Sequence, residues 1–271
     1  MPKRKSPNAK KLVQSTLQFK SAATVVKCSK CLMTYSTNSP SDLVQHKRYH
    51  DLHLNGRKWS AGWGDIVSRV ELRMFEKQLD CNGTGETGNR KLSFQLRPQS
   101  TYEENEYIVM ISPKKPNEVK ATLDLMAVVN EELSAPHDEN AFWSEFPEPE
   151  KPQGKAFVYV KKNRAVGVIT IEHIEKTDRG KWMVLDTKSI VPNVIPDVKL
   201  GISRIWVSRN HRKHGIATRL LEIARKKSIY GCIVNKWELA WSQPSQSGSI
   251  LARRYNAVKH QSGKLLLPCY I

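Results

Sequence analysis

Residues 212–217, Arg-Lys-His-Gly-Ile-Ala, combine three basic or hydrogen-bond-donating side chains with a glycine, which suits an anion-binding loop. The apolar run over 201–208 predicts a buried strand, and apolar residues spaced three and four apart after Gly215 predict a helix. The first N–H groups of a helix have no intrahelical partner and carry the positive end of its dipole. Gly215 has no Cβ to keep a ligand away from them. The segment therefore predicts a pyrophosphate site, with a plain strand–loop–helix turn as the alternative.

A second set of residues has the spacing of a metal centre. Cys28, Cys31, His46 and His50 follow the pattern C-x2-C-x14-H-x3-H, which is typical of zinc ligands. The two histidines are one helical turn apart, so their imidazoles point the same way. A module of this size cannot bury enough apolar surface to fold alone, so the metal must supply the missing free energy. We predict a structural zinc finger, whose partner could be DNA phosphate or another protein.

Charge and composition limit the classes of function. The chain has 271 residues, with 44 Lys and Arg against 26 Asp and Glu, a net charge of +18. Residues 1–60 hold twelve basic and two acidic residues, which favours nucleic acid or chromatin as a partner, with a solvated tail as the alternative. We expect no membrane span and no secretory signal, because apolar runs of the required length are absent from the sequence. Five unevenly spaced cysteines favour a reducing compartment.

The sequence predicts four segments along the chain. Residues 1–24 are expected to be a disordered basic tail, 25–64 a zinc finger with an ordered turn, 65–106 a linker with a short helix over 65–80, and 107–271 a mixed α/β domain. In that domain we expect strands over 107–112, 156–160, 165–171, 181–186, 201–208, 237–242 and 264–271, and helices over 116–133, 215–228 and 248–255. Hairpins followed by strand–helix–strand units favour a mixed sheet.

Four stretches carry a resemblance to a known family. They are GISRIWVSR, GIATRLLEIAR, AWSQPSQSG and YNAVKHQSGKLLLPCYI, and they resemble the fungal-type cohesion-establishment acetyltransferases, which modify the cohesin ring. The pattern R-x-x-G-x-A at 212–217 resembles the acyl-CoA-binding loop of the GNAT acetyltransferases. The resemblance implies a GNAT fold, in which a central strand splays from its neighbour and acyl-CoA enters the gap.

The resemblance also implies acetyl-CoA as the donor and a set of residues that hold it. The strand contributes through its backbone, while we expect its side chains to be buried core. The implied donor-binding residues are Ile205, Trp206, Val207, Arg212, Lys213, His214, Gly215, Ile216, Ala217, Thr218, Ser245, Gln246 and Ser247.

Acetyl transfer to lysine needs a base or a desolvating site, because the amine has an unperturbed pKa of about 10.4. Glu222 lies off the apolar stripe of its helix, which fits either a cleft-facing carboxylate or an exposed partner of Lys226. The resemblance implies a catalytic role for Glu222 and, at the strand start, for Ser203. Animal members have an aspartate, proposed as catalytic, where this chain has Gln243, which cannot take a proton. Either Glu222 alone serves or substrate carboxylates help.

The function implied by the resemblance is acetylation of lysines on the ATPase head of cohesin's SMC subunit, in the nucleus, establishing sister chromatid cohesion during DNA replication. Gln14, Leu17 and Phe19 resemble a sliding-clamp-binding box, although Phe19 comes one position early and no second aromatic follows. Two alternatives stay open: a zinc-finger chromatin-binding module with an inactive GNAT fold, and a small-molecule amine N-acetyltransferase.

Overall fold

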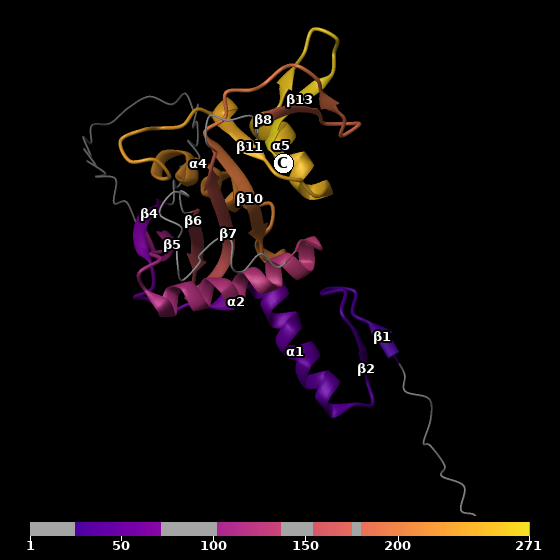
Figure 1. Cartoon of the computed structure of the whole chain (residues 1–271). Coiled ribbons are helices and arrows are strands. Elements are labelled where there is room, and N and C mark those ends of the chain that lie inside the picture. The colour runs from indigo at the N-terminus through magenta and orange to yellow at the C-terminus, as the bar shows by residue number, and fades with distance from the viewer. Residues whose placement is uncertain (1–24, 72–101, 137–153, 175–179, 271) are drawn as a thin grey trace, which may run out of the picture. The chain divides into compact units, whose positions relative to one another are not determined.

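The computed structural model describes residues 25–71, 102–136, 154–174 and 180–270 (Figure 1). The chain divides into two compact units, Met1–His50 and Asp51–Ile271. The described residues contain no helix long and apolar enough to cross a lipid bilayer. The expected clamp-binding residues, Gln14, Leu17 and Phe19, lie outside the described residues.

The first unit has the expected ββα order. Strand β1 (Val25–Lys27) pairs antiparallel with β2 (Thr34–Ser36), and helix α1 (Pro40–Asn55) follows and continues past the division between the units. The turn between the strands is closed by the N–H of Cys28 donating to the carbonyl of Met33 at 2.9 Å. The ring of Tyr35 stacks on His46 with centroids 3.9 Å apart.

The second unit is built on one 11-stranded sheet with three described α-helices. The strands are β3 (Arg57–Lys58), β4 (Asp65–Glu71), β5 (Tyr102–Met110), β6 (Lys155–Lys161), β7 (Arg164–His173), β8 (Gly180–Val184), β9 (Ile190–Val191), β10 (Leu200–Val207), β11 (Leu239–Trp241), β12 (Val258–Lys259) and β13 (Leu265–Tyr270). The α-helices are α2 (Pro116–Leu133), α4 (Ile216–Lys227) and α5 (Gln246–Tyr255), with 3-10 turns at Arg209–His211 and Lys236–Glu238.

The strand order is β4-β5-β6-β7-β10-β11-β13-β8-β9, with β12 beside β13 and β3 beside β7. Figure 1 shows β4 to β11 side by side in this order. All pairs are antiparallel except β10 with β11 and β11 with β13, so the sheet is mixed as expected. Lys162 and Asn163 form the tight β6–β7 turn with φ of 48° and 56°, the left-handed conformation that two-residue hairpin loops favour.

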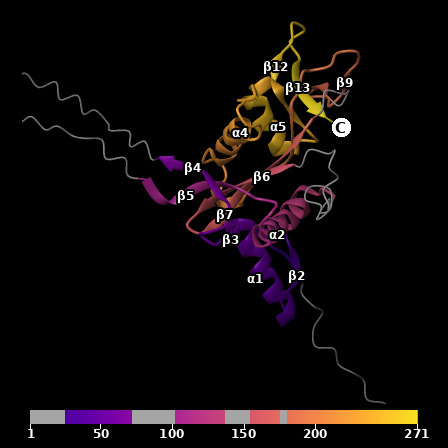
Figure 2. The same ribbon diagram turned by 60° about the vertical axis from the view of Figure 1, so that its left-hand side comes forward.

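Two apolar cores lie on opposite faces of the sheet. Helix α2 packs Leu125 and Val129 with Val158 and Val168 of the strands. Helices α4 and α5 pack on a second core that includes Leu220. Figure 2 shows α2 on one side of β6 and β7 and α4 on the other. The sheet is therefore covered on both faces around β7 and β10.

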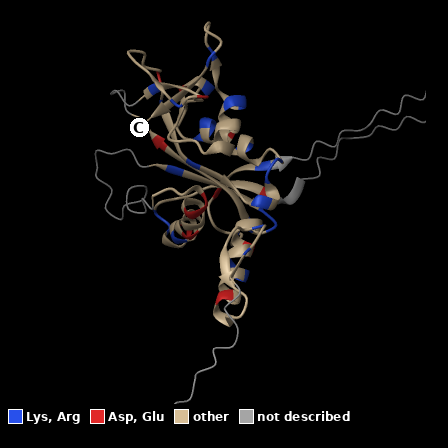
Figure 3. Ribbon diagram, turned by 90° about the vertical axis from the view of Figure 1, so that its right-hand side faces the viewer, with Lys and Arg blue, Asp and Glu red and all other residues tan. Residues whose placement is uncertain are grey.

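Basic residues lie in the last turns of α4 and α5, the two helices that pack on the second core. Arg225, Lys226 and Lys227 end α4, and Arg253 and Arg254 end α5. Figure 3 shows where Lys and Arg lie along the ribbon. Cations in the last turn complement the negative end of a helix dipole, so these positions favour both helices.

The structure differs from the sequence prediction between residues 57 and 106. The short helix expected over 65–80 is wrong for residues 65–71, which form strand β4, and residues 72–101 lie outside the described part. Ile66 and Val70 are four apart, and this spacing fits one face of a strand as well as of a helix. Strands β3, β4 and β5 join the sheet. The second unit, Asp51–Ile271, therefore includes β3 from the segment expected to be finger and turn, and β4 from the segment expected to be linker.

Candidate functional site

Strand β10 has one edge that is only partly covered. On one side β7 pairs with it from Leu200 to Val207. On the other, β11 pairs with it only from Leu200 to Ile202, and the N–H of Ser242 donates the last hydrogen bond, to the carbonyl of Ile202 at 3.2 Å. Within the described residues no strand lies beside β10 beyond this point on that side. The two parallel strands therefore separate, as the sequence resemblance implied.

The register decides which backbone groups point to the open edge. The N–H of Ser208 donates to the carbonyl of Val166 at 2.8 Å, and pairs in an antiparallel ladder alternate between hydrogen-bonded and non-bonded. Trp206, opposite Val168, therefore directs its polar groups to β7, whereas Ile205 and Val207 direct theirs to the open edge. Of the three residues whose backbone was expected to contact the donor, Ile205 and Val207 have polar groups directed to the open edge, and Trp206 does not. The side chain of Trp206 is buried core, as expected.

The loop after β10 ends at an uncapped helix start. Gly215 is the N-cap of α4, with φ of 77°, and no side chain caps the helix. A Cβ built on Gly215 meets no other atom within 4 Å, so the space before the helix is open. The first intrahelical bond runs from the N–H of Arg219 to the carbonyl of Gly215. The N–H groups of Ile216, Ala217 and Thr218 are thus the donors left for an anion.

The three basic side chains of the loop differ in their contacts. Lys213 and His214 are exposed. The guanidinium of Arg212 instead donates from Nε to the carbonyl of Val207 at 2.9 Å and from a terminal nitrogen to Glu132 at 2.7 Å. Arg212 is therefore bound to the end of β10 in this structure.

Ser245, Gln246 and Ser247 lie where β11 leads into α5. The Oγ of Ser245 accepts from the N–H of Gly248 at 3.2 Å and caps α5. All three residues are exposed. The hydroxyl of Ser245 is therefore used to cap α5, while the side chains of Gln246 and Ser247 are accessible to a ligand.

Hydroxyl groups gather where β10 and β11 separate. The Oγ of Ser242 donates to the carbonyl of Ser203 at 3.1 Å. Burial raises the pKa of Tyr270, an effect partly offset by hydrogen bonds with Ser203 and Ser242. The ring of Tyr270 lies where a Cβ on Gly201 would stand, 2.6 Å from the nearest ring atoms. Ser203 was expected at this site from the resemblance, and its role stays a prediction. Tyr270 was not expected here, because no local pattern marks a tyrosine at the end of the last strand.

Both carboxylate oxygens of Glu222 are engaged. Arg225 donates to Oε2 at 2.7 Å and the hydroxyl of Tyr255 donates to Oε1 at 2.8 Å. Burial raises the pKa of Glu222, but the hydrogen bonds from Arg225 and Tyr255 outweigh burial and hold this pKa below its ordinary value. The helical neighbour that pairs with Glu222 is Arg225, whereas Lys226 was the partner considered from the sequence. Glu222 is therefore ionised at neutral pH and a weak base.

Glu132, near the C-terminal end of α2, is a site residue that the sequence did not reveal. Its side chain is 10% exposed. Four groups donate to it: His53, Trp206, Arg209 and Arg212. Burial raises the pKa of Glu132, but the hydrogen bonds from His53, Trp206 and Arg212 prevail and lower it to about 2.

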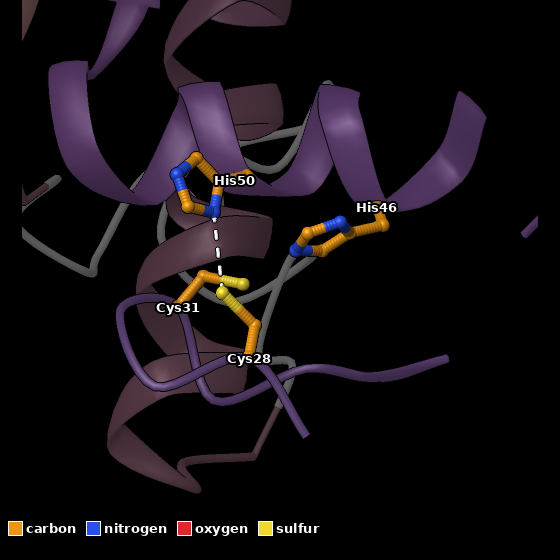
Figure 4. Close-up of side chains that lie close together, drawn as sticks. All are labelled: Cys28, Cys31, His46 and His50. Atoms are coloured by element: carbon orange, nitrogen blue, oxygen red, sulfur yellow. Dashed lines mark hydrogen bonds between the residues drawn. The ribbon is translucent and has the colours of Figure 1, made fainter. Parts of the chain in front are cut away.

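The four predicted metal ligands converge in the first unit. Cys28 and Cys31 come from the turn after β1, and His46 and His50 come from one face of α1 (Figure 4). Their ligand atoms all lie within 4.8 Å of one another. The Nε2 of His46 is buried without a partner in the described residues, as expected for an atom that binds a metal. Hydrogen bonds from the backbone, chiefly from Cys31, lower the pKa of Cys28 to about 5, which favours the thiolate that zinc requires.

Comparisons with known proteins show which family the chain belongs to. A family model described as ESCO1/2 acetyl-transferase matches residues 196–263, and one described as zinc-finger of acetyl-transferase ESCO matches 14–52. The chain is 75% identical to N-acetyltransferase ECO1 of Kluyveromyces lactis, over 100% of both chains. It is 45% identical to N-acetyltransferase ECO1 of Saccharomyces cerevisiae, over 99% of this chain and 98% of the relative.

Among solved structures, the xEco2 acetyltransferase domain bound to a K105-CoA conjugate is similar, with a TM-score of 0.45 and 23% identity. The match covers 62% of this chain and 94% of that one. The full-length similarity to the fungal relatives carries the conclusion. The chain is an acetyl-CoA-dependent acetyltransferase with a structural zinc finger, and it belongs to the ECO1/ESCO N-acetyltransferase family.

Proposed function

We propose that this protein transfers the acetyl group of acetyl-CoA to lysine side chains on the ATPase head of cohesin's SMC subunit, and so establishes sister chromatid cohesion during DNA replication. The observation that carries the enzymatic part is the open backbone edge of β10 beside the uncapped start of α4. The substrate rests on family membership, which extends over the finger and the sheet domain together.

The donor site that we propose uses two kinds of backbone group. The N–H groups of Ile216, Ala217 and Thr218 bind the pyrophosphate at the positive end of α4, and the exposed side chains of Lys213 and His214 add basic character. The carbonyl of Ile205 and the N–H of Val207 pair with the amides of the pantetheine arm, because Arg212 already donates to the carbonyl of Val207. Gln246 and Ser247 contact the donor from the opposite side of the gap.

For the chemical step we propose roles for a backbone donor and two side chains. The N–H of Ile205 is directed to the open edge and is suited to bind the thioester oxygen as negative charge develops on it. Ser203 lies at the point of separation and holds the donor or the acceptor. Glu222, ionised at neutral pH, attracts the acceptor ammonium and accepts its proton only transiently, because its two hydrogen bonds make it a weak base.

Partners and location follow from the same proposal. A cohesin head and a sliding clamp are both nuclear, and we propose that the protein acts in the nucleus. Gln14, Leu17 and Phe19 are the proposed clamp-binding residues. The net charge of +18 supports contact with chromatin.

An acceptor competition assay tests the proposal. Radiolabelled acetyl-CoA is offered to the full chain with isolated cohesin heads, polyamines or aminoglycosides, and labelled lysines are mapped by mass spectrometry. We expect label on a small number of head lysines. Equal labelling of the small amines would favour a small-molecule acetyltransferase, and donor binding without transfer to any acceptor would favour a binding module.

A further inference from the structure

A single buried carboxylate joins α2 to the loop that precedes α4. Glu132 accepts on Oε1 from Arg209 at 3.1 Å and from Arg212 at 2.7 Å. It accepts on Oε2 from Trp206 at 2.7 Å, and Oε2 also lies 3.2 Å from Nδ1 of His53. These donors come from the end of β10, the loop after it and the end of α1. One side chain of α2 therefore links the end of α1 to the end of β10 and the loop that follows it, which lie far from α1 in sequence.

Arg212 is the link between this carboxylate and the strand edge. One terminal nitrogen of its guanidinium donates to Glu132, while Nε donates to the carbonyl of Val207. Val207 is one of the two residues whose polar groups the register directs to the open edge. Arg212 thus occupies the carbonyl of Val207 and fixes the last residue of β10 against α2.

A guanidinium held in this way is poorly placed to act as a simple phosphate ligand. Its Nε and a terminal nitrogen already have charge-assisted or backbone acceptors at 2.7–2.9 Å. Lys213 and His214 beside it are exposed, and their side chains make no such contacts within the described part of the chain. The basic side chains of the loop therefore divide into one that supports the strand and two that face solvent.

We propose that Glu132 is a positioning residue for the donor: it holds Arg212 against Val207 and so shapes the strand edge that receives the pantetheine arm, while the pyrophosphate is bound by the start of α4. The inference rests on the proposed donor site and divides that site into two parts. The part on the edge of β10, which receives the pantetheine arm, depends on Glu132 and Arg212. The part at the start of α4, which binds the pyrophosphate, depends on Gly215.

The division can be tested with two donors that differ in their phosphates. S-acetylpantetheine carries the thioester and both amides of acetyl-CoA but lacks the pyrophosphate and nucleotide. Dissociation constants for both donors are measured on the full chain by calorimetry or NMR titration. We use Glu132→Gln, Arg212→Met and Gly215→Asp, with Glu131→Gln as the matched control, since Glu131 is its exposed neighbour on α2.

We expect Glu132→Gln and Arg212→Met each to weaken both donors by the same factor, about 10-fold, the loss of one charge-assisted hydrogen bond. The double variant is expected to lose no more than Arg212→Met alone, because the two residues act in series. Glu131→Gln is expected to leave both constants unchanged. Since the side chain of Arg212 is 41% exposed, Arg212→Met keeps the proposal testable if the buried substitution unfolds the protein.

Specific outcomes would overturn the proposal. If Arg212→Met weakens acetyl-CoA but not S-acetylpantetheine, Arg212 is a phosphate ligand. If Glu132→Gln lowers the melting temperature but changes neither constant, Glu132 only stabilises the fold. Gly215→Asp separates this failure from failure of the proposed donor site. That variant is expected to weaken acetyl-CoA selectively, and no effect on either donor would place the donor elsewhere.

Discussion

The hydroxyl of Tyr255 donates a hydrogen bond to Oε1 of Glu222 at 2.8 Å, joining α5 to α4. Arg225 takes the other oxygen, and Lys236 stands 3.9 Å from Oε1. Burial raises the pKa of Glu222, but these partners together keep it below the ordinary value of a glutamate. A carboxylate of this kind is a stable anion, so its contribution to catalysis is expected to be electrostatic more than that of a strong base.

Glu222→Gln is therefore expected to lower kcat by about 10- to 100-fold while the affinity for acetyl-CoA stays unchanged. The substitution keeps the size of the side chain but removes the charge that attracts the acceptor. Steady-state kinetics with saturating acetyl-CoA measure kcat, and a separate binding experiment measures the affinity for acetyl-CoA. Lys226→Gln is the control, because Lys226 is exposed and is not the ion-pair partner of Glu222. Unchanged kcat in Glu222→Gln would exclude a catalytic role.

The pH profile of the reaction gives a further prediction. Because the pKa of Glu222 is lowered, this residue is ionised throughout the range from about pH 6 to about pH 9. The rate is expected to rise with pH over this range only because the acceptor amine, with a pKa of about 10.4, becomes neutral. Glu222→Gln is expected to give a lower curve of the same shape. An inflection near pH 6 to 7 in the unmodified protein that is missing from the variant would instead mean that bound acceptor raises the pKa of Glu222.

Gly215→Asp is expected to weaken acetyl-CoA binding strongly, because it puts a negative charge at the proposed pyrophosphate position. Space is available for the side chain, and an anion near a helix start favours the helix itself, so the protein is expected to stay folded. Gly215→Asn separates charge from shape, since asparagine tolerates the left-handed backbone as well. We expect the Gly215→Asn variant to bind acetyl-CoA more tightly than the Gly215→Asp variant, as measured by calorimetry. Equal affinity in the two variants would remove the electrostatic argument.

The matched control for position is Gly231→Asp. Gly231 also has a left-handed backbone, with φ of 71°, and open space around a built Cβ. It lies after α4 and outside the proposed site. Its aspartate is expected to leave acetyl-CoA affinity unchanged, which would show that the effect at Gly215 is local.

Local patterns in the sequence predicted the elements that carry their own signal. Helix α2 has the expected bounds, and α4 begins within one residue of Gly215. The Cys and His spacing predicted the finger because its ligands are close in sequence. Glu132 and Tyr270 were missed, because each contacts the proposed site only through parts of the chain more than 25 residues away. Strand β4 was misassigned, because its apolar spacing suits both a helix and a strand.

Zinc removal is expected to unfold the first unit. The four ligands are its main means of stabilisation, since β1, β2 and the start of α1 bury little apolar surface. Elemental analysis is expected to find about one zinc ion per chain. A strong chelator or Cys28→Ser is expected to remove the metal and the dispersed NMR signals of residues 25–50. Cys232→Ser is the control, because Cys232 is a free cysteine in the second unit. A finger that stays folded without metal would contradict the prediction.

Acid is expected to weaken the fold through Glu132. Its pKa is about 2 in the folded protein against an ordinary value of 4.5, so the folded state favours the ionised form. The resulting stabilisation, about 3 kcal/mol, is present in full above the ordinary pKa and is lost as pH falls towards the folded pKa. Glu132→Gln lacks this stabilisation at every pH.

The free energy of unfolding is measured with urea from about pH 6 to about pH 3. The difference in this free energy between the unmodified protein and Glu132→Gln is expected to narrow below about pH 4.5. Glu131→Gln, at the exposed neighbouring position, is expected to differ little from the unmodified protein in free energy of unfolding at every pH. A difference for Glu132→Gln that does not change with pH would mean that the hydrogen bonds of Glu132 do not depend on its charge.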